Sequence, residues 1–295
     1  MALRLDGRHY GQLLDHWGGG EDLRQGLIRV LHSLSFVDDP TRMLRAVRLA
    51  ERLGFEIERR TGELLADAIP LIDRVSGDRI RHELALIFKE PRMVTIMRRL
   101  AEMNLLEAIE PSLRWDGWLE DRWTAAKSFE APPAWGLEGG PDFEALLFAL
   151  WLCRATASEV RRVSDRLHLP GWLQRMVEGA QAAGRALAEV PAGAPPSRLV
   201  ALLDGYPEAS LACAWLALEP SAESRRWIAS YLETWRKIRQ RADGRDLQAL
   251  GLAPGPQYGK ILDRLRAGWL DGEIRSAEEE RSQLESLVAE AVHRG

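Results

Sequence analysis

Apolar residues recur at intervals of three and four along most of the chain, which is the spacing of one helix face. The N-terminus differs, because residues 1–5 and 10–14 flank an Asp6-Gly7 turn and predict a short β-hairpin. The predicted helices cover residues 21–31, 40–53, 61–69, 76–89, 91–103, 142–153, 157–168, 171–189, 197–203, 207–217, 221–241, 243–250, 256–268 and 277–293. The pattern therefore predicts a mainly α protein with a small β element at its start.

The length of 295 residues suggests two or three units rather than one core. Pro- and Gly-rich stretches at 131–141 and 190–196 are the best candidates for linkers or long loops. A lone hairpin buries too little apolar surface to be stable in water. We therefore expect the N-terminal strands either to pack on the helices or to belong to a sheet upstream of Met1.

Charge and cysteine content narrow the class of protein. The formal net charge is −4, so any nucleic-acid surface must be local, and residues 225–245 carry the clearest excess of Lys and Arg. Cys153 and Cys213 lie in apolar helical contexts and are expected to be small core residues, with no disulfide or metal pattern. No apolar run reaches about 18 residues and no signal peptide is evident, which predicts a cytoplasmic protein without a membrane partner.

Residues 38–54 are the most informative stretch. Pro40 suits the first helical position, which makes Asp39 the expected N-cap, and Gly54 is the expected stop. At 100° per residue, four arginines fall on one side of this helix: Arg42, Arg45, Arg48 and Arg52. The opposite side carries Met43, Ala46, Val47, Ala50 and Leu53, which can face a core. Such a helix is suited to an anionic partner.

Asp39 and Arg42 suggest a sharper hypothesis. A carboxylate accepts hydrogen bonds and a guanidinium donates them. Cytosine and adenine each place an amino group beside a bare ring nitrogen, whereas uracil and guanine place a carbonyl beside an N–H. A pair of these two side chains therefore matches C and A and mismatches U and G. The alternative is that Asp39 only caps the helix and Arg42 is solvated.

A second polar pair, Arg79 and Glu83, lies one turn apart on a helix for which Ser76 is the expected N-cap. Such pairs are usually surface stabilisers of the helix. The alternative is a brace that holds the arginine helix in place.

The C-terminal region reads as helix, tight turn, helix over residues 243–264. Its turn glycines expose backbone N–H groups at the start of the second helix, a natural phosphate site. Arg245, Lys260 and Arg264 would extend the positive edge toward RNA, and the alternative is a plain corner between two helices.

Eleven tryptophans raise the question of base stacking. Trp151, Trp172 and Trp215 have apolar helical spacing and are expected in the core. Trp17, in the Gly-rich loop at 17–20, is the exception, and that loop is also readable as a simple connection before a helix capped by Glu21 or Asp22.

The chain lacks the common catalytic motifs: no Gly-x-x-x-x-Gly-Lys loop, no HExxH and no Gly-x-Ser-x-Gly. It resembles instead the class II tRNA nucleotidyltransferase and bacterial poly(A) polymerase family. The resemblance covers nearly the whole chain and is carried by Ile-Arg-Val-Leu-His at 28–32, Ser-Phe-Val-Asp-Asp-Pro-Thr-Arg at 35–42, Arg-Met-Leu-Arg-Ala-Val-Arg at 42–48, Leu-Gly-Phe at 53–55, Arg-Ile-Arg-His-Glu-Leu at 79–84, and Leu-Gly-Leu with Pro-Gly-Pro at 250–256.

The resemblance implies a head, followed by a helical neck, body and tail. Here it implies a head remnant and connector at 1–31, a neck at 32–104, a body at 105–220 and a tail at 221–295. It implies that Asp39 and Arg42 pair with the base of incoming ATP or CTP, with Arg45 and Arg48 beside the same site and Arg79 and Glu83 in support. It assigns a flexible connector to Asp15, Gly19 and Asp22, and backbone contacts with tRNA to the body and tail.

The chain departs from the family in its head. The Gly-Gly-x-x-Arg-Asp loop and the Asp-x-Asp strand that hold two Mg²⁺ ions in the family are not in this sequence, and Met1-Ala2-Leu3 resembles the end of a head motif. Two-metal phosphoryl transfer needs such ligands. We therefore expect a tRNA-binding part that is inactive alone. The resemblance leaves open A-adding, CCA-adding or poly(A) activity, the oligomeric state, and a noncatalytic helical RNA-binding or assembly module.

Overall fold

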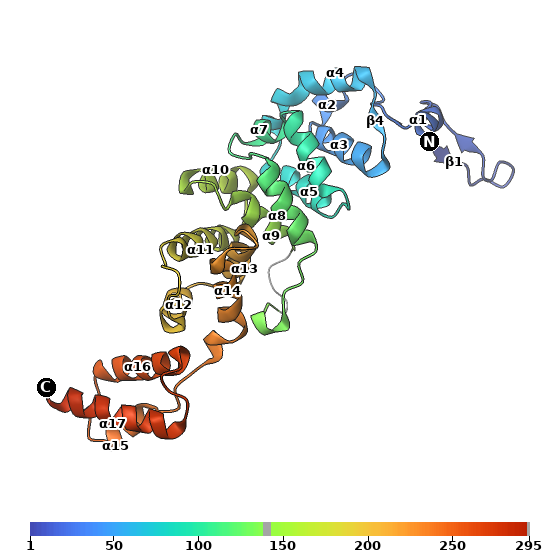
Figure 1. Ribbon diagram of the computed structural model, residues 1–295. Coiled ribbons are helices and arrows are strands. Elements are labelled where there is room, and N and C mark those ends of the chain that lie inside the picture. Colours follow the sequence, from blue (N-terminus) through green and yellow to red (C-terminus); the bar gives the residue numbers. More distant parts are fainter. Residues whose placement is uncertain (138–142, 294–295) are drawn as a thin grey trace. The chain divides into compact units, whose positions relative to one another are not determined.

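The computed structural model describes residues 1–137 and 143–293, and these residues are mainly helical, as predicted. The chain forms two compact units (Figure 1). Unit 1 comprises Met1–Phe129 with Asp142–Arg175, and unit 2 comprises Glu130–Pro141 with Met176–Gly295. No helix in the described part of the chain is both long enough and apolar enough to cross a bilayer.

The predicted N-terminal hairpin is present but short. Strand β1 (Ala2–Leu3) pairs antiparallel with β2 (Leu13–Leu14), so that Ala2 lies opposite Leu14. The helix expected at 21–31 is instead α1 (Gly19–Gln25), which ends because Gly26 adopts φ 67°. Two of the residues that were expected in this helix instead form strand β3 (Leu27–Ile28). It pairs parallel with β4 (Glu56–Ile57), a pairing that the sequence pattern did not predict.

The arginine helix, α3, and the other helices make up the rest of unit 1. They are α2 (Ser35–Asp38), α3 (Arg42–Leu53), α4 (Arg59–Ala68), the 3₁₀ helix η1 (Ile69–Arg74), α5 (Gly77–Phe88), α6 (Met93–Glu102), α7 (Leu105–Ile109), α8 (Gly117–Lys127), α9 (Phe143–Leu152) and α10 (Ala157–Leu167). Helix α3 packs on α5 and α6. Its buried face carries Met43, Leu44 and Val47, each fully enclosed.

Most of what the sequence predicted for helix α3 is confirmed, with three differences. The helix begins at Arg42, with Thr41 as N-cap, because Asp39 is extended and closes α2. Leu53 is 47% exposed rather than in the core, and Arg48 is only 9% exposed rather than on the open face.

The helix α11 (Gly171–Ala188) is followed in unit 2 by α12 (Pro196–Leu203), α13 (Glu208–Ala217), α14 (Glu223–Glu233), α15 (Gly244–Ala249), α16 (Gln257–Asp271) and α17 (Ala277–His293), with 3₁₀ helices η2 (Pro133–Trp135) and η3 (Trp235–Lys237). The last three helices enclose an apolar core of Ala242, Leu247, Leu252, Ile261, Leu265, Ile274, Leu284 and Val288. This core confirms the predicted pairing of helices around the turn at 250–256.

Several boundaries were wrong. The helix expected at 221–241 stops at Glu233, because Thr234 leaves the helical conformation with φ −128°. Arg236 Nε then donates to the carbonyl oxygen of Leu232 in the last turn. Helices α7 and α8 were not predicted. Residues 138–142, which include part of the linker predicted at 131–141 and the first residue of the helix predicted at 142–153, lie outside the described residues.

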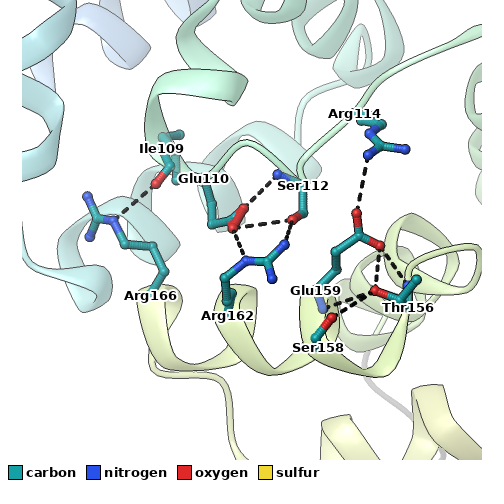
Figure 2. A network of polar contacts seen from close by, with 9 residues as sticks. All are labelled: Ile109, Glu110, Ser112, Arg114, Thr156, Ser158, Glu159, Arg162 and Arg166. Atoms are coloured by element: carbon teal, nitrogen blue, oxygen red, sulfur yellow. Dashed lines mark hydrogen bonds and ion pairs between the residues drawn. The ribbon is translucent and has the colours of Figure 1, made fainter.

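A polar network fixes α10 on the segment that follows α7 (Figure 2). Glu110, only 6% exposed, accepts from the Ser112 amide at 2.6 Å and from Arg162 Nε at 3.0 Å. Arg166 donates from Nε to the Ile109 carbonyl at 3.1 Å and from Nη1 to the Val75 carbonyl at 2.9 Å. Buried carbonyls that lack helical partners are thereby satisfied. The C-terminal end of α10 is consequently held against the start of α5.

Candidate functional site

A pocket of about 430 Å³ opens where the start of α3 meets the first turns of α5. It brings together five of the six residues predicted for nucleotide binding and its support, with Arg48 as the exception. Its lining consists of Asp39, Thr41, Arg42, Arg45, Asp78, Arg79, His82 and Glu83. This size lies within the range of about 300–1,000 Å³ that is usual for small-molecule sites.

Asp39 is anchored through one of its two carboxylate oxygens. Its Oδ1 accepts from the Thr41 amide at 3.1 Å, from Thr41 Oγ1 at 2.7 Å and from Arg79 Nη2 at 2.8 Å. Within residues 1–137 and 143–293, Oδ2 has no hydrogen-bond partner. Burial acts to raise the pKa of Asp39, but the bonds from Thr41 and Arg79 outweigh it and hold this pKa below its usual value. The group is therefore an ionised acceptor with one open oxygen.

Arg42 is anchored in the same manner. Its Nη1 donates to the Ser35 carbonyl at 3.2 Å and to Ser35 Oγ at 2.9 Å. Neither Nε nor Nη2 has a partner among the described residues. Arg42 thus presents open donors in the pocket where Asp39 presents an open acceptor.

The supporting pair is arranged differently from the predicted surface pair. Arg79 and Glu83 do not bond to each other; Arg79 holds Asp39, and Glu83 lies 3.8 Å from Arg48 Nη2. Arg48 Nη1 also donates to Glu90 at 3.1 Å. Arg79 of α5 therefore contacts the segment before α3, and Glu83 of α5 and Glu90 contact Arg48 of α3.

The four arginines of α3 consequently differ. Arg45 is exposed, lines the pocket and has no polar partner in the described part of the chain. Arg48 is enclosed between Glu83 and Glu90, and Arg52 is half-exposed and lies 3.8 Å from Glu90. Arg42 and Arg45 are thus the α3 guanidiniums that an anion in the pocket can reach.

The start of α5 is fixed by contacts with the end of α10. Ser76 is the N-cap residue as predicted, although its side chain makes no capping bond. A Cβ atom on Gly77 would lie 2.2 Å from the Arg166 carbonyl oxygen, so only glycine fits. Asp78 binds His168 Nδ1 at 3.0 Å, and Arg81 Nη1 donates to the Leu167 carbonyl at 3.0 Å.

Sequence reasoning missed Thr41, Asp78 and His82 as lining residues. Thr41 and Asp78 each follow a predicted N-cap by two residues, and His82 lies one turn after Asp78 on the predicted helix. Projecting the first turn of each helix would have identified them.

The predicted connector residues lie around α1. The Asp15 carboxylate accepts from the amides of Gly19 at 2.9 Å and Gly20 at 2.7 Å, and these bonds, the Gly20 bond first, lower its pKa. The cap of α1 is therefore Asp15 reaching across Gly18, not Glu21 or Asp22. Asp22 instead pairs with Arg29 at 3.0 Å.

The predicted RNA-binding residues lie on α15 and α16 of unit 2. Arg245 and Lys260 are exposed, and their side chains have no polar partner in the described residues. Arg264 is paired with Glu273 at 2.7 Å. Arg245 and Lys260 are therefore the freer cations of this set.

The residues present do not fit a magnesium site. No group of three His, Cys, Asp or Glu side chains within 1–137 and 143–293 could hold a metal ion. The pocket carboxylates are bound by cationic side chains: Asp39 by Arg79, Asp78 by Arg81 and Glu83 by Arg48. No reaction step is therefore assigned to a metal on these residues.

Similarity to known proteins agrees with this geometry. Residues 54–115 match the family described as "Probable RNA and SrmB- binding site of polymerase A". An A-adding tRNA nucleotidyltransferase of Geobacter sulfurreducens is 30% identical over 95% of this chain and 33% of its own length. A CC-adding tRNA nucleotidyltransferase of the same organism is 31% identical over 92% of this chain and 69% of its own length.

Solved structures extend the similarity to the fold. A Thermotoga maritima CCA-adding enzyme complexed with tRNA superposes with a TM-score of 0.75 at 28% identity, over 98% of this chain and 70% of that one. A CCA-adding enzyme in complex with ATP gives a TM-score of 0.77 at 29% identity, over 98% and 69%. The chain belongs to the class II tRNA nucleotidyltransferase family. It spans about a third of the A-adding relative from G. sulfurreducens.

Proposed function

We propose that this chain binds the 3′ end of tRNA and selects the nucleotide, ATP or CTP, that is added there. Asp39 and Arg42 are the base-reading pair. The observation that carries the proposal is that one pocket is lined by both Asp39, with Oδ1 held and Oδ2 open, and Arg42, with Nη1 held and its other donors open.

The hydrogen-bonding pattern sets the selectivity. Asp39 Oδ2 accepts from the exocyclic amino group of adenine or cytosine, and Arg42 donates to the neighbouring ring nitrogen. Uracil and guanine would place a carbonyl against the carboxylate and an N–H against the guanidinium. Both protein groups would then be left unpaired, which strongly disfavours the wrong base. The exposed Arg45 is the phosphate contact in this proposal, and Arg48 positions α3.

Nucleotide addition joins the RNA 3′-oxygen to the α-phosphorus of the nucleotide and releases pyrophosphate. We propose that this chain contributes selection and RNA binding, and that the metal-binding carboxylates belong to other residues than those described. In support, the sequence contains no Asp-x-Asp strand motif preceded by a Gly-Gly-x-x-Arg-Asp loop. Incorporation of label from ATP or CTP into tRNA without its CCA end, by this polypeptide alone, would contradict this part of the proposal.

Nucleotide binding by the intact chain tests the selection directly. Titration calorimetry with ATP, CTP, GTP and UTP is expected to show tighter binding of the first two. Loss of a hydrogen bond to a charged group costs about 1.5–3 kcal/mol, so Asp39→Ala is expected to weaken ATP and CTP about 10- to 150-fold and to abolish the preference.

Asp38→Ala is the matched control, because Asp38 is the adjacent carboxylate, lies outside the pocket lining and is half-exposed. It is expected to leave the nucleotide preference unchanged. A wild-type preference in Asp39→Ala, or loss of preference in Asp38→Ala, would refute the assignment of the base-reading residue.

A further inference from the structure

A second pocket, of about 310 Å³, lies beside the first in unit 1. It is formed by α5, α9 and the junction of α10 with α11, and its lining includes Arg81, Glu144, Phe148, His168 and Trp172. Trp172 was expected in the core, but it is 48% exposed, whereas Phe148 beside it is 1% exposed. The other lining residues, Ala145, Leu169, Pro170 and Leu173, are apolar, so the half-exposed indole lies in a mainly apolar pocket with three polar side chains at its edge. Such an indole is a surface on which a flat ring can stack.

We propose that this pocket binds a nucleobase of the RNA strand, that of its 3′-terminal residue, by stacking on Trp172. The inference rests on the proposed function, since it assigns the RNA end that receives the selected nucleotide. It concerns residues that the base-reading pocket does not use.

The two pockets share a wall. Asp78 lines the first pocket, and its carboxylate binds His168 at 3.0 Å and Arg81 at 2.9 Å, both of which line the second. Because addition joins the RNA 3′-oxygen to the incoming nucleotide, the terminal RNA residue must lie next to that nucleotide. A site for that terminal residue must adjoin the first pocket, and the second pocket adjoins it at Asp78.

The polar groups around Trp172 suit a nucleotide rather than an apolar ligand. His168 is bound to Asp78 through Nδ1 only, and its Nε2 has no partner among the described residues, so it is available to a base edge. Arg175 lies one turn along α11 from Trp172, is exposed and has no polar partner in the described part of the chain. Residues three apart share a helix face, so Arg175 can reach the phosphate of a base stacked on Trp172.

The test uses the full chain and a short single-stranded RNA that carries the fluorescent base 2-aminopurine at its 3′ end. Stacking quenches this base, and it is worth about 1–3 kcal/mol by alanine substitution. Wild type and Trp172→Phe are expected to quench the probe. Trp172→Ala is expected to lose the quenching and to bind about 5- to 150-fold more weakly.

Two controls make the outcome decisive. Trp17→Ala removes another exposed indole, 66% exposed, and is expected to quench normally; loss of quenching there would overturn the assignment. A probe with 2-aminopurine at an internal position is expected to be quenched less, and equal quenching would refute a site for the terminal base. Wild-type quenching and affinity in Trp172→Ala would overturn the proposal outright.

The Asp39→Ala variant separates this inference from the proposed function. It is expected to lose nucleotide preference while it quenches the RNA probe normally. If quenching depends on Trp172 but nucleotide preference does not depend on Asp39, the stacking pocket stands and the base-reading assignment fails. If nucleotide preference depends on Asp39 but quenching does not depend on Trp172, the proposed stacking pocket is refuted and the base-reading assignment stands.

Discussion

The two carboxylate oxygens of Asp39 differ in their hydrogen bonding. Oδ1 is held by Thr41 and Arg79, and Oδ2 is open. Fixing one oxygen orients the other without blocking it. A recognition group that is oriented before binding loses less conformational entropy when its ligand arrives.

The first prediction concerns the pH range over which Asp39 stays charged. Its folded-state pKa lies below the ordinary 3.8, because bonds from Thr41 and Arg79 outweigh burial. Its contribution to stability is therefore present above pH 3.8 and is lost as the pH falls through the lowered folded-state pKa. In Arg79→Gln, we expect an NMR titration to show a higher Asp39 pKa. As the pH is lowered, ATP binding should therefore be lost at a higher pH than in the wild type. Arg59→Gln, in which a 93% exposed side chain is changed, should leave both unchanged.

The second prediction concerns two arginines that share Glu90. Arg48 is enclosed between Glu83 and Glu90, so its removal leaves uncompensated carboxylates in a buried place. Arg48→Ala is expected to lower the free energy of unfolding by about 3–5 kcal/mol. Arg52 is 53% exposed, and Arg52→Ala is expected to cost less than about 1 kcal/mol. Urea denaturation measures both, and equal losses would contradict the enclosed role of Arg48.

At the scale of elements, α10 determines where α5 begins. Arg166 holds the backbone before α5, Gly77 packs on the Arg166 carbonyl, and Arg81 binds the last carbonyls of α10. The first turn of α5 carries Arg79, which holds Asp39. The placement of Asp39, in the proposed base-reading pair, therefore depends on a helix that contributes no residue to the pocket.

The third prediction tests this dependence with two glycines in helices. A Cβ on Gly77 would lie 2.2 Å from a backbone oxygen, so Gly77→Ala is expected to destabilise unit 1 by about 1–3 kcal/mol and to weaken the A and C preference. Gly62, in α4, has its nearest neighbour at 4.0 Å. Gly62→Ala is expected to be neutral or to stabilise by up to about 1 kcal/mol. Thermal unfolding with nucleotide titration measures both effects, and matching behaviour of the two variants would count against the close packing.

The local spacing of apolar residues predicted the helices that have one solvent-exposed and one buried face. It predicted the buried Met43 and Val47 of α3, because their spacing is repeated along a whole helix. It missed α8, whose apolar positions are interrupted by charged residues at 120–122, although the capping Asp116 was a usable signal. It could not predict the pairing of β3 with β4, since each strand is two residues long and their register joins Leu27 to Glu56.

The site was predictable to the same extent. The Asp39 and Arg42 pair was predicted from a spacing of three residues at the start of the arginine helix, although Asp39 itself precedes that helix. The partners of Arg48 and Arg79 do not, because they are separated from them by 35 residues or more in the chain. Trp172 was misjudged because helical spacing gives a face but not whether that face is covered in the first turn of α11.

At the scale of the whole molecule, charge is distributed unevenly. The chain carries a net charge of −4, so the proposed binding of RNA requires local cationic groups rather than an overall field, and Arg245 and Lys260 are the groups we propose for it. These two side chains are exposed on unit 2, and neither has a carboxylate partner in the described residues.

The fourth prediction follows from the release of counterions. Each phosphate contact contributes about −0.7 to −0.9 to the slope of log K against log salt concentration. Lys260→Ala is expected to weaken tRNA binding at low salt and to reduce the slope by about 1. Arg281→Ala, at an 81% exposed arginine already paired with Glu285, is expected to leave the slope unchanged. Filter binding over a salt series measures this, and an unchanged slope in Lys260→Ala would exclude the contact.

The ion pair between Arg79 and Asp39 joins residues that are 40 positions apart. An unfolded or partly folded chain cannot hold these groups together, so the oriented carboxylate exists only once α3 and α5 have packed. A nucleotide that needs this carboxylate binds the folded form alone and therefore stabilises it by mass action. Under the proposed function, ATP and CTP would therefore act as chemical chaperones for unit 1, and UTP and GTP would not.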